Sequence, residues 1–316
     1  MDTVLRMQIK LDAAPSRVYE ALTDDAALTA WFTEFSAVDV AAGAYDFWGR
    51  FTPGAPTRGE GKHPVTEHRV GRLLSYDWHL SEGLTNVRLM LRERESEVTM
   101  LTLHHANGDL GQHHNYALAP EDFWFLSLEN LRRYLDGKAC DARVDFSKSM
   151  KGDITHVIDI DADAGTVFEV LLSPKQLERW IASKATVEPH VGGKIDLGWG
   201  EGVGAIKILE LDPNKKLAYQ WDEDGETGQA TTVTWTLEEG SGQTRLTFTH
   251  SGFDDDTDNS GIYAGWRNFQ SWVRSIAEYG DNWQPAVKLL TNPGHAAWYP
   301  KSINDAQALF TDEAVE

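Results

Sequence analysis

Two histidines occupy corresponding places in two similar strand sequences: "MLTLHH" ends at His105 and "RLTFTH" ends at His250. Imidazole exchanges protons near neutral pH, so a histidine that faces a pocket can act as a general base. The alternative is a strand-end histidine that is hydrogen-bonded to the backbone. Tyr116 and Tyr263 precede two long helical sequences, where a tyrosine can bury its ring and donate from its hydroxyl. These four residues are the candidate catalytic residues.

Tryptophan is concentrated in the second half of the chain, which has eight of the twelve residues. A cluster of indole rings can line a pocket for a flat, apolar ligand. Ordinary packing in the core is the alternative for each of them. The predicted ligand-binding residues are Trp78, Trp124, Trp199, Trp221, Trp235, Trp266 and Trp272. Because of the unequal distribution, the second half is expected to hold the main ligand site.

Other polar motifs do not predict a cofactor or a metal. The segment "HHANGDLGQHH" at 104–114 lacks the helical His spacing of a zinc site. The glycines of "GEGVGAIK" at 200–207 join two expected strands and indicate a hairpin instead of a phosphate loop. Glu67 and Glu210 match each other, but glutamates between polar neighbours in a strand are expected to face water. We therefore predict no metal and no cofactor.

The sequence segments that position these residues occur twice in the chain. "DAAPSRVYEALTDDAALTAWF" at 12–32 aligns without a gap with "DADAGTVFEVLLSPKQLERWI" at 161–181, and Trp31 meets Trp180. "LLSYDW" and "LAYQW", the two His-ending strands and a closing helix follow in the same order in both halves. A period near 150 residues is that of a whole domain and not of a solenoid unit.

Each copy is expected to contain a strand, two short helices, five or six antiparallel strands and a long helix. This order predicts an α+β fold with two tandem domains, each a curved antiparallel sheet wrapped around a long C-terminal helix. The expected boundaries are 1–138 for the first domain, 139–152 for a linker, 153–280 for the second domain and 281–316 for a C-terminal extension.

These phrases resemble the SRPBCC (START-like, helix-grip) superfamily. Within it they are most similar to bacterial relatives of the C-terminal domain of the activator of the ninety-kilodalton heat-shock chaperone's ATPase. The resemblance implies a helix-grip fold with a hydrophobic pocket between the sheet and the long helix. Its members include lipid carriers, hormone receptors, polyketide cyclases and chaperone regulators, so the fold does not select a function.

Composition excludes several classes of partner. The net charge of −20 argues against nucleic acid, because phosphate backbones are bound by concentrated basic surfaces. The sequence has no apolar stretch long enough for a membrane span. A single cysteine, Cys140, forms no internal disulfide, which is typical of a reducing compartment. We therefore expect a cytoplasmic protein.

Three functions follow from these observations. The first is binding of a small hydrophobic or aromatic ligand between sheet and long helix, without chemistry. The second is a cyclase or hydrolase that acts on an aromatic or polyketide-like substrate through His105, His250, Tyr116 or Tyr263. The third is a cofactor of a chaperone ATPase, which the resemblance suggests. The eukaryotic activator's N-terminal domain is replaced here by a second domain of the C-terminal type, which argues against the third.

Overall fold

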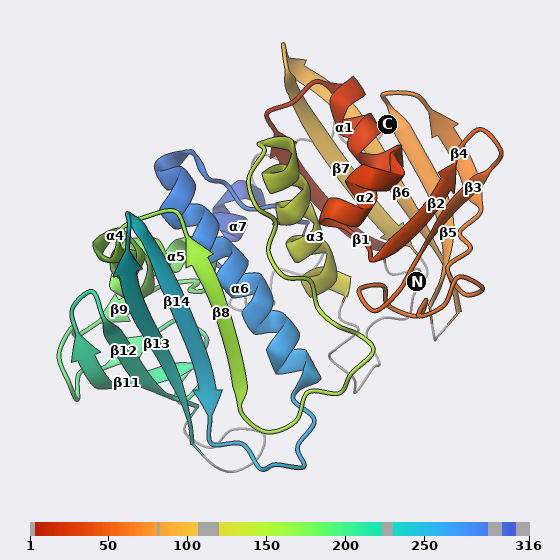
Figure 1. Ribbon diagram of the computed structural model, residues 1–316. Helices are drawn as coiled ribbons and strands as arrows, with labels where there is room; N and C mark the ends of the chain where they lie inside the picture. Colours follow the sequence, from red (N-terminus) through yellow and green to blue (C-terminus); the bar gives the residue numbers. More distant parts are fainter. Residues whose placement is uncertain (1–3, 81–82, 107–119, 223–229, 290–298, 308–316) are drawn as a thin grey trace. The chain divides into compact units, whose positions relative to one another are not determined.

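The computed structural model of the chain divides into two compact units, each with its own antiparallel sheet and long helix (Figure 1). The structure describes residues 4–80, 83–106, 120–222, 230–289 and 299–307. The first unit contains the described residues up to 149 together with 286–289, and the second contains the rest. No helix in the described ranges has the length and apolarity that crossing a membrane requires.

The first unit has a six-stranded sheet in the order β15-β1-β7-β6-β5-β4 and a separate β2-β3 ribbon. Its strands are β1 (Val4–Leu11), β2 (Phe35–Asp39), β3 (Ala44–Trp48), β4 (Val65–Arg69), β5 (Leu73–Leu80), β6 (Gly83–Glu95), β7 (Val98–Ala106) and β15 (Val287–Lys288). Its helices are α1 (Pro15–Thr23), α2 (Asp25–Trp31) and α3 (Pro120–Leu135). Along β7 every second residue is buried, as expected of a strand with one face on a core. The three helices cover that face of the sheet.

The second unit repeats this plan around a five-stranded sheet in the order β11-β12-β13-β14-β8. Its strands are β8 (Ile154–Ile160), β9 (Thr186–Val187), β10 (Ile195–Asp196), β11 (Ala205–Asp212), β12 (Lys216–Trp221), β13 (Thr231–Gly240) and β14 (Gln243–Ser251). Its helices are α4 (Ala164–Leu172), α5 (Pro174–Trp180), α6 (Ser260–Tyr279), a short 3-10 turn η2 (Gly280–Asn282) and α7 (Lys301–Ala306). The predicted α+β helix-grip architecture, present twice, is confirmed.

The repeated sequence phrase builds the same helix pair in both units. In the first unit, Nε1–H of Trp31 at the end of α2 donates to the carbonyl of Ala21 in α1, at 2.9 Å. In the second unit, Nε1–H of Trp180 donates to the carbonyl of Val170, at 3.0 Å. Both indoles are buried, so each Trp fixes the angle between two short helices and satisfies its own donor at the same time.

The segment after α6 contributes to both units. Strand β15 pairs antiparallel with β1 and forms one edge of the first unit's sheet, with Met7 opposite Lys288 and Gln8 opposite Val287. The ammonium of Lys288 contacts the carboxylate of Glu121 on α3. Farther along the chain, α7 packs on the second unit, where Ile303 is fully buried. The sequence pattern predicts no strand at residues 287–288.

Candidate functional site

His105 is the second-to-last residue of β7 and is hydrogen-bonded through both ring nitrogens. Nε1–H of Trp124, on α3, donates to Nδ1 of His105 at 3.1 Å. A neutral imidazole that accepts at Nδ1 carries its proton on Nε2, and Nε2 lies 2.9 Å from Oγ1 of Thr85. Thr85 in turn donates to the carbonyl of Trp78 at 2.8 Å. Every donor in this series of hydrogen bonds therefore has an acceptor.

His250 has the same network in the second unit. Nε1–H of Trp266, on α6, donates to Nδ1 of His250 at 3.0 Å, and Nε2 lies 2.7 Å from Oγ1 of Thr231. Thr231 donates to the carbonyl of Trp221 at 3.3 Å. The imidazole thus joins the sheet to the long helix in both units, and we call the two networks the Trp–His–Thr relays.

Burial disfavours the imidazolium form in both relays. It lowers the pKa of His105 to about 4 and that of His250 to about 3. A general base needs a lone pair that is directed at the substrate proton. Here Nδ1 accepts from an indole and Nε2 donates to a hydroxyl, so the ground state of either histidine offers no such lone pair. Both histidines form these hydrogen bonds with side chains. The alternative expected from the sequence was a strand-end histidine that is hydrogen-bonded to the backbone.

The two candidate tyrosines do not join these relays. Tyr116 lies outside the described residues. The ring of Tyr263 packs edge-on against His156 at 4.5 Å between ring centroids, and its hydroxyl accepts from the Arg267 guanidinium at 3.2 Å. Tyr263 therefore belongs to a second buried cluster on α6, apart from His250.

His156 is a buried titratable residue that the sequence analysis did not single out. It is 1 % exposed, and its Nδ1 lies 3.0 Å from Oε1 of Gln270. Its Nε2 has no hydrogen-bond partner among the described residues. Burial, with a smaller contribution from the charge of Arg267, lowers the pKa of His156 to about 2. The alternation of apolar and polar residues along β8 could have predicted that this side chain points inward. It could not have predicted the contact with Gln270 of α6.

Five of the seven predicted ligand-binding tryptophans are buried among other aromatic rings: Trp78, Trp124, Trp235, Trp266 and Trp272. Trp78 stacks on His105 at 5.7 Å with an interplanar angle of 4°. Trp235 packs on Phe248 at 4.7 Å and donates from Nε1 to the Tyr219 hydroxyl. In the structure these rings fill the space between sheet and helix.

One cavity in the interior of the first unit has a volume of about 10 Å³. It is lined by aromatic and aliphatic side chains from the sheet and α3, among them Tyr45, Tyr76 and Trp124. A cavity of this size holds about one water molecule. At this place the described side chains of the first unit therefore pack closely between sheet and helix.

The second unit contrasts with the first at Trp199 and Trp221, which are both half-buried. Their rings meet edge to face at 5.7 Å. The loop that holds Trp199 also forms a hollow of about 620 Å³, lined by residues between Lys194 and Ile206, which we call the glycine hollow. Gly204 has φ of +77°, and a methyl group there would lie 2.9 Å from Cε3 of Trp199, so glycine is required for the indole to lie in this position.

The remaining acidic candidates face outward or line this hollow. Glu67 forms ion pairs with Arg69 and Arg88, and Glu210 pairs with Lys216 at 2.8 Å. Asp196 lines the glycine hollow and accepts from the amide of Gly198. Within the described part of the chain, no three His, Cys, Asp or Glu side chains gather as a metal site would require.

Two sheet–helix units with matched relays define a protein of the helix-grip class, duplicated in tandem. Comparison with protein families gives the same result. The profile described as "Activator of Hsp90 ATPase homolog 1-like protein" matches residues 12–136 and again residues 161–279. The chain belongs to this family, and the resemblance seen in the sequence is confirmed.

Solved structures with similar folds include the Aha1 dimer from Colwellia psychrerythraea, with 26 % identity over 41 % of this chain and 98 % of that chain and a TM-score of 0.37. Protein MLL2253 from Mesorhizobium loti has 27 % identity over 40 % of this chain and 99 % of that chain, with a TM-score of 0.34. DynU16, from the dynemicin biosynthetic locus, covers 87 % of this chain and 98 % of its own at 18 % identity, with a TM-score of 0.32. No curated protein matches the sequence.

Proposed function

We propose that the protein binds a small hydrophobic or aromatic molecule without transforming it, and that the second unit holds the principal site. The observation that carries the proposal is the glycine hollow, whose lining includes the apolar side chains of Ile195, Val203 and Ile206. Its volume of about 620 Å³ lies within the range of small-molecule pockets, about 300–1,000 Å³. Trp199 lies in the same loop and contacts Trp221, and both indoles are only half-buried, so they offer a flat molecule a further apolar surface.

The relays support binding over catalysis. Each imidazole has both nitrogens engaged and a lowered pKa, so it stabilises the contact between sheet and helix. A cyclase or hydrolase mechanism through His105 or His250 stays a prediction, and it requires one relay to open first. Loss of turnover in His250→Gln, with an unchanged fold, is the result that would favour it.

The first experiment identifies what the protein carries. Purified protein is incubated with an extract of its host, washed and denatured, and the released compounds are identified by mass spectrometry. We expect one apolar compound in near-stoichiometric amount. An empty protein would contradict the proposal.

Variants locate the site with a neutral probe, Nile red, whose fluorescence reports an apolar surface. Trp199→Ala removes half of the indole pair and is expected to weaken binding about tenfold, or about 1.4 kcal/mol. Trp48→Ala is the matched control, since Trp48 is a half-buried tryptophan of the first unit. Equal weakening by both variants, or weakening by Trp48→Ala alone, would contradict the assignment to the second unit.

A cofactor of a chaperone ATPase remains the second candidate, and the family description favours it. Direct capture of the chaperone at micromolar affinity, by a protein that carries no small molecule, is the result that would favour this function.

A further inference from the structure

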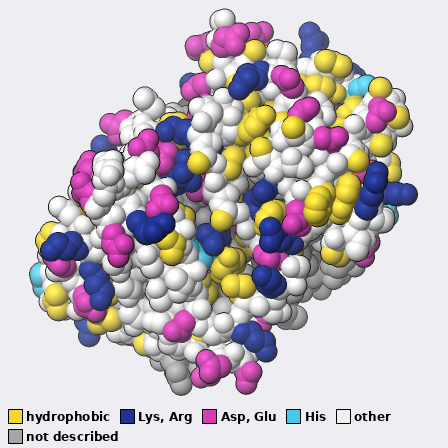
Figure 2. Space-filling model, in the orientation of Figure 1, with side chains coloured by type: hydrophobic (Ala, Val, Ile, Leu, Met, Phe, Trp, Pro, Cys, Tyr) yellow, Lys and Arg dark blue, Asp and Glu magenta, His cyan; other side chains and the backbone are white. Residues whose placement is uncertain are grey.

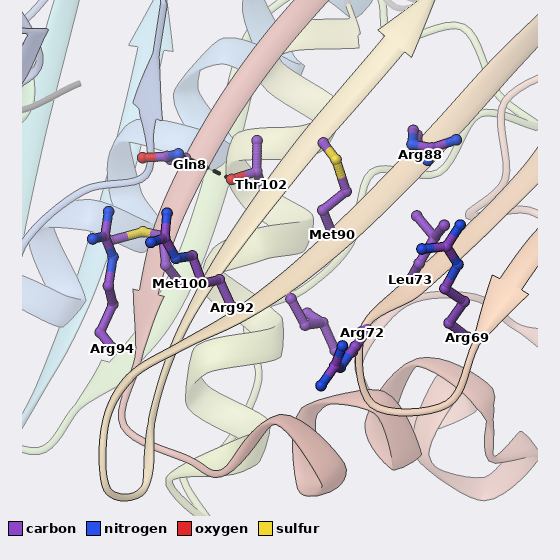
Figure 3. Close-up of a pocket in the computed structure, with 11 residues that line it drawn as sticks. Gln8, Arg69, Arg72, Leu73, Arg88, Met90, Arg92, Arg94, Met100 and Thr102 are labelled. Atoms are coloured by element: carbon purple, nitrogen blue, oxygen red, sulfur yellow. Dashed lines mark hydrogen bonds between the residues drawn. The ribbon is translucent and has the colours of Figure 1, made fainter. Parts of the chain in front are cut away.

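Arginines gather on the outer face of the first unit's sheet, the face opposite α3. Arg69 and Arg72 come from the end of β4 and the following turn, and Arg88, Arg92 and Arg94 come from β6. Together they line a hollow of about 300 Å³, which we call the arginine hollow (Figure 3). Five of the sixteen arginines in the chain therefore line one depression.

Three of these guanidinium groups have no acidic partner among the described residues. Glu67 pairs with Arg69 and with Arg88, at 2.9 Å in each case. Arg72, Arg92 and Arg94 are exposed and have no such carboxylate. No acidic side chain is found among the described residues that line the hollow. The five positive charges are thus opposed by the single negative charge of Glu67.

A neighbouring histidine reports the resulting positive potential. His104 lies on the same face, opposite Arg88 in the β6–β7 ladder and opposite Arg6 in the β1–β7 ladder. Burial, and then the charges of Arg6 and Arg88, lower the pKa of His104. The chain carries −20 overall, but salt screens charges farther away than about 10 Å at 0.1 M. The local excess of arginine therefore decides what can bind in the hollow.

The second unit shows that this face does not require arginine. In its sheet, Glu238 lies opposite Arg245, at the ladder position where the first unit has Arg92 opposite Met100. The ladders place the counterparts of Arg69, Arg88 and Arg92 at Asp212, Thr234 and Glu238. The same fold is therefore built with threonine and acidic side chains at these positions. Three of the five arginines are therefore particular to the first copy, whereas the position of Arg72 is occupied by Lys215 in the second.

The base of the hollow has a different character from its rim. Leu73, Met90 and Met100 form an apolar surface between the arginines (Figure 3). Gln8 and Thr102 satisfy each other, with Nε2 of Gln8 donating to Oγ1 of Thr102 at 2.9 Å. Methionine side chains adapt to irregular shapes, so the base can accept a short apolar portion of a ligand.

We propose that the arginine hollow binds a compact molecule with two or more negative charges, carried by phosphate or carboxylate groups. Guanidinium groups bind both kinds of group through paired N–H···O hydrogen bonds. A volume of about 300 Å³ is at the lower end of small-molecule pockets and suits a compact anion. Charged side chains of both signs are interspersed on the face of the protein that Figure 2 shows.

Isothermal titration calorimetry of the full chain with inorganic pyrophosphate tests the proposal, and citrate serves as the carboxylate probe. We expect saturable one-site binding that weakens as NaCl rises from about 0.05 M to about 0.15 M. Each of Arg72→Gln, Arg92→Gln and Arg94→Gln is expected to weaken binding about tenfold, since each removes a positive charge and its hydrogen bonds to the anion. These exposed substitutions are expected to leave the melting temperature nearly unchanged.

The matched control removes the same charge from the second unit's sheet. Lys215, Lys216 and Arg245 are each paired with an acidic side chain there. The triple variant Lys215→Gln, Lys216→Gln, Arg245→Gln is expected to bind pyrophosphate as the unaltered protein does. Equal weakening by this variant and by the triple variant Arg72→Gln, Arg92→Gln, Arg94→Gln would show a general effect of charge and overturn the proposal. Binding of a polyglutamate peptide without binding of pyrophosphate or citrate would also overturn it, in favour of an acidic protein partner.

Discussion

At the scale of single residues, the relays explain why histidine recurs at the same place in both halves. Imidazole has an acceptor and a donor on opposite sides of a flat ring, so it can join an indole N–H on a helix to a hydroxyl on a strand. His105 and His250 both do so, with geometries that agree to within a few tenths of an ångström. A serine or an asparagine does not span this distance with the same shape.

The relays predict how stability depends on pH. In the unfolded chain a histidine titrates near pH 6.5, whereas burial lowers the pKa of His105 to about 4. Between these values the unfolded state binds more protons, so the free energy of unfolding falls as the pH falls from 6.5 toward 4. We expect each relay histidine to contribute a loss of about 2 kcal/mol between pH 7 and pH 5.

Urea unfolding of the unaltered protein and of His250→Gln measures this effect. The variant lacks one titrating group and is expected to show a smaller loss between the two pH values, although it is less stable at pH 7. Identical pH dependence for both proteins would mean that His250 is not buried in its neutral form.

At the scale of elements, the two Trp-anchored helix pairs are the most local part of the fold. α1 and α2 are each shorter than the length at which isolated helices become stable in water, about 12–15 residues. Trp31 and Trp180 supply the buried area and the hydrogen bond that hold such short helices against each other. The N-caps Asp24 and Asp163 add a second local signal at the start of α2 and α4.

Trp180→Phe tests the anchor. Phenylalanine keeps most of the buried ring but leaves the carbonyl of Val170 without its donor, so we expect the free energy of unfolding to fall by about 1–3 kcal/mol. Trp31→Phe should have a similar effect in the first unit. Trp48→Phe, at a half-buried ring, is the control and should cost less. Urea midpoints measure all three, and equal effects at Trp48 and Trp180 would argue against an anchoring role.

At the scale of the whole molecule, much of the architecture could be predicted because duplication shows each element twice. The gapless match between residues 12–32 and residues 161–181 predicted the helix pairs. The alternation of apolar and polar residues predicted the strands. The partners of the histidines could not be predicted, because Thr85 and Thr231 lie about 20 positions earlier and meet them only through side-chain hydrogen bonds between neighbouring strands. The arginine hollow was missed because its residues alternate with apolar ones on β6 and read as an ordinary solvated strand face.

Strand β15 was missed for a different reason. Two residues carry no periodicity, and the pairing partner β1 lies more than 270 positions earlier in the chain. Strand β15 covers an edge of the sheet, where unpaired amides and carbonyls invite association with other chains. A chain that ends at Pro285 is expected to exchange its β1 amides faster and to associate more readily. Hydrogen exchange followed by mass spectrometry, together with light scattering, measures both, and unchanged exchange in β1 would contradict this role.

The same pairing has a consequence for the order of events during synthesis. The strands that β15 joins leave the ribosome first, but residues 287–288 appear only after the whole of α6. At about 5–20 residues per second, the roughly 150 residues after α3 take about 8–30 seconds to make. During that interval the nascent first domain has its other strands and helices, but β1 lacks the strand that pairs with its outer edge. The hydrogen bonds between β1 and β15 can form only after the second domain has been translated.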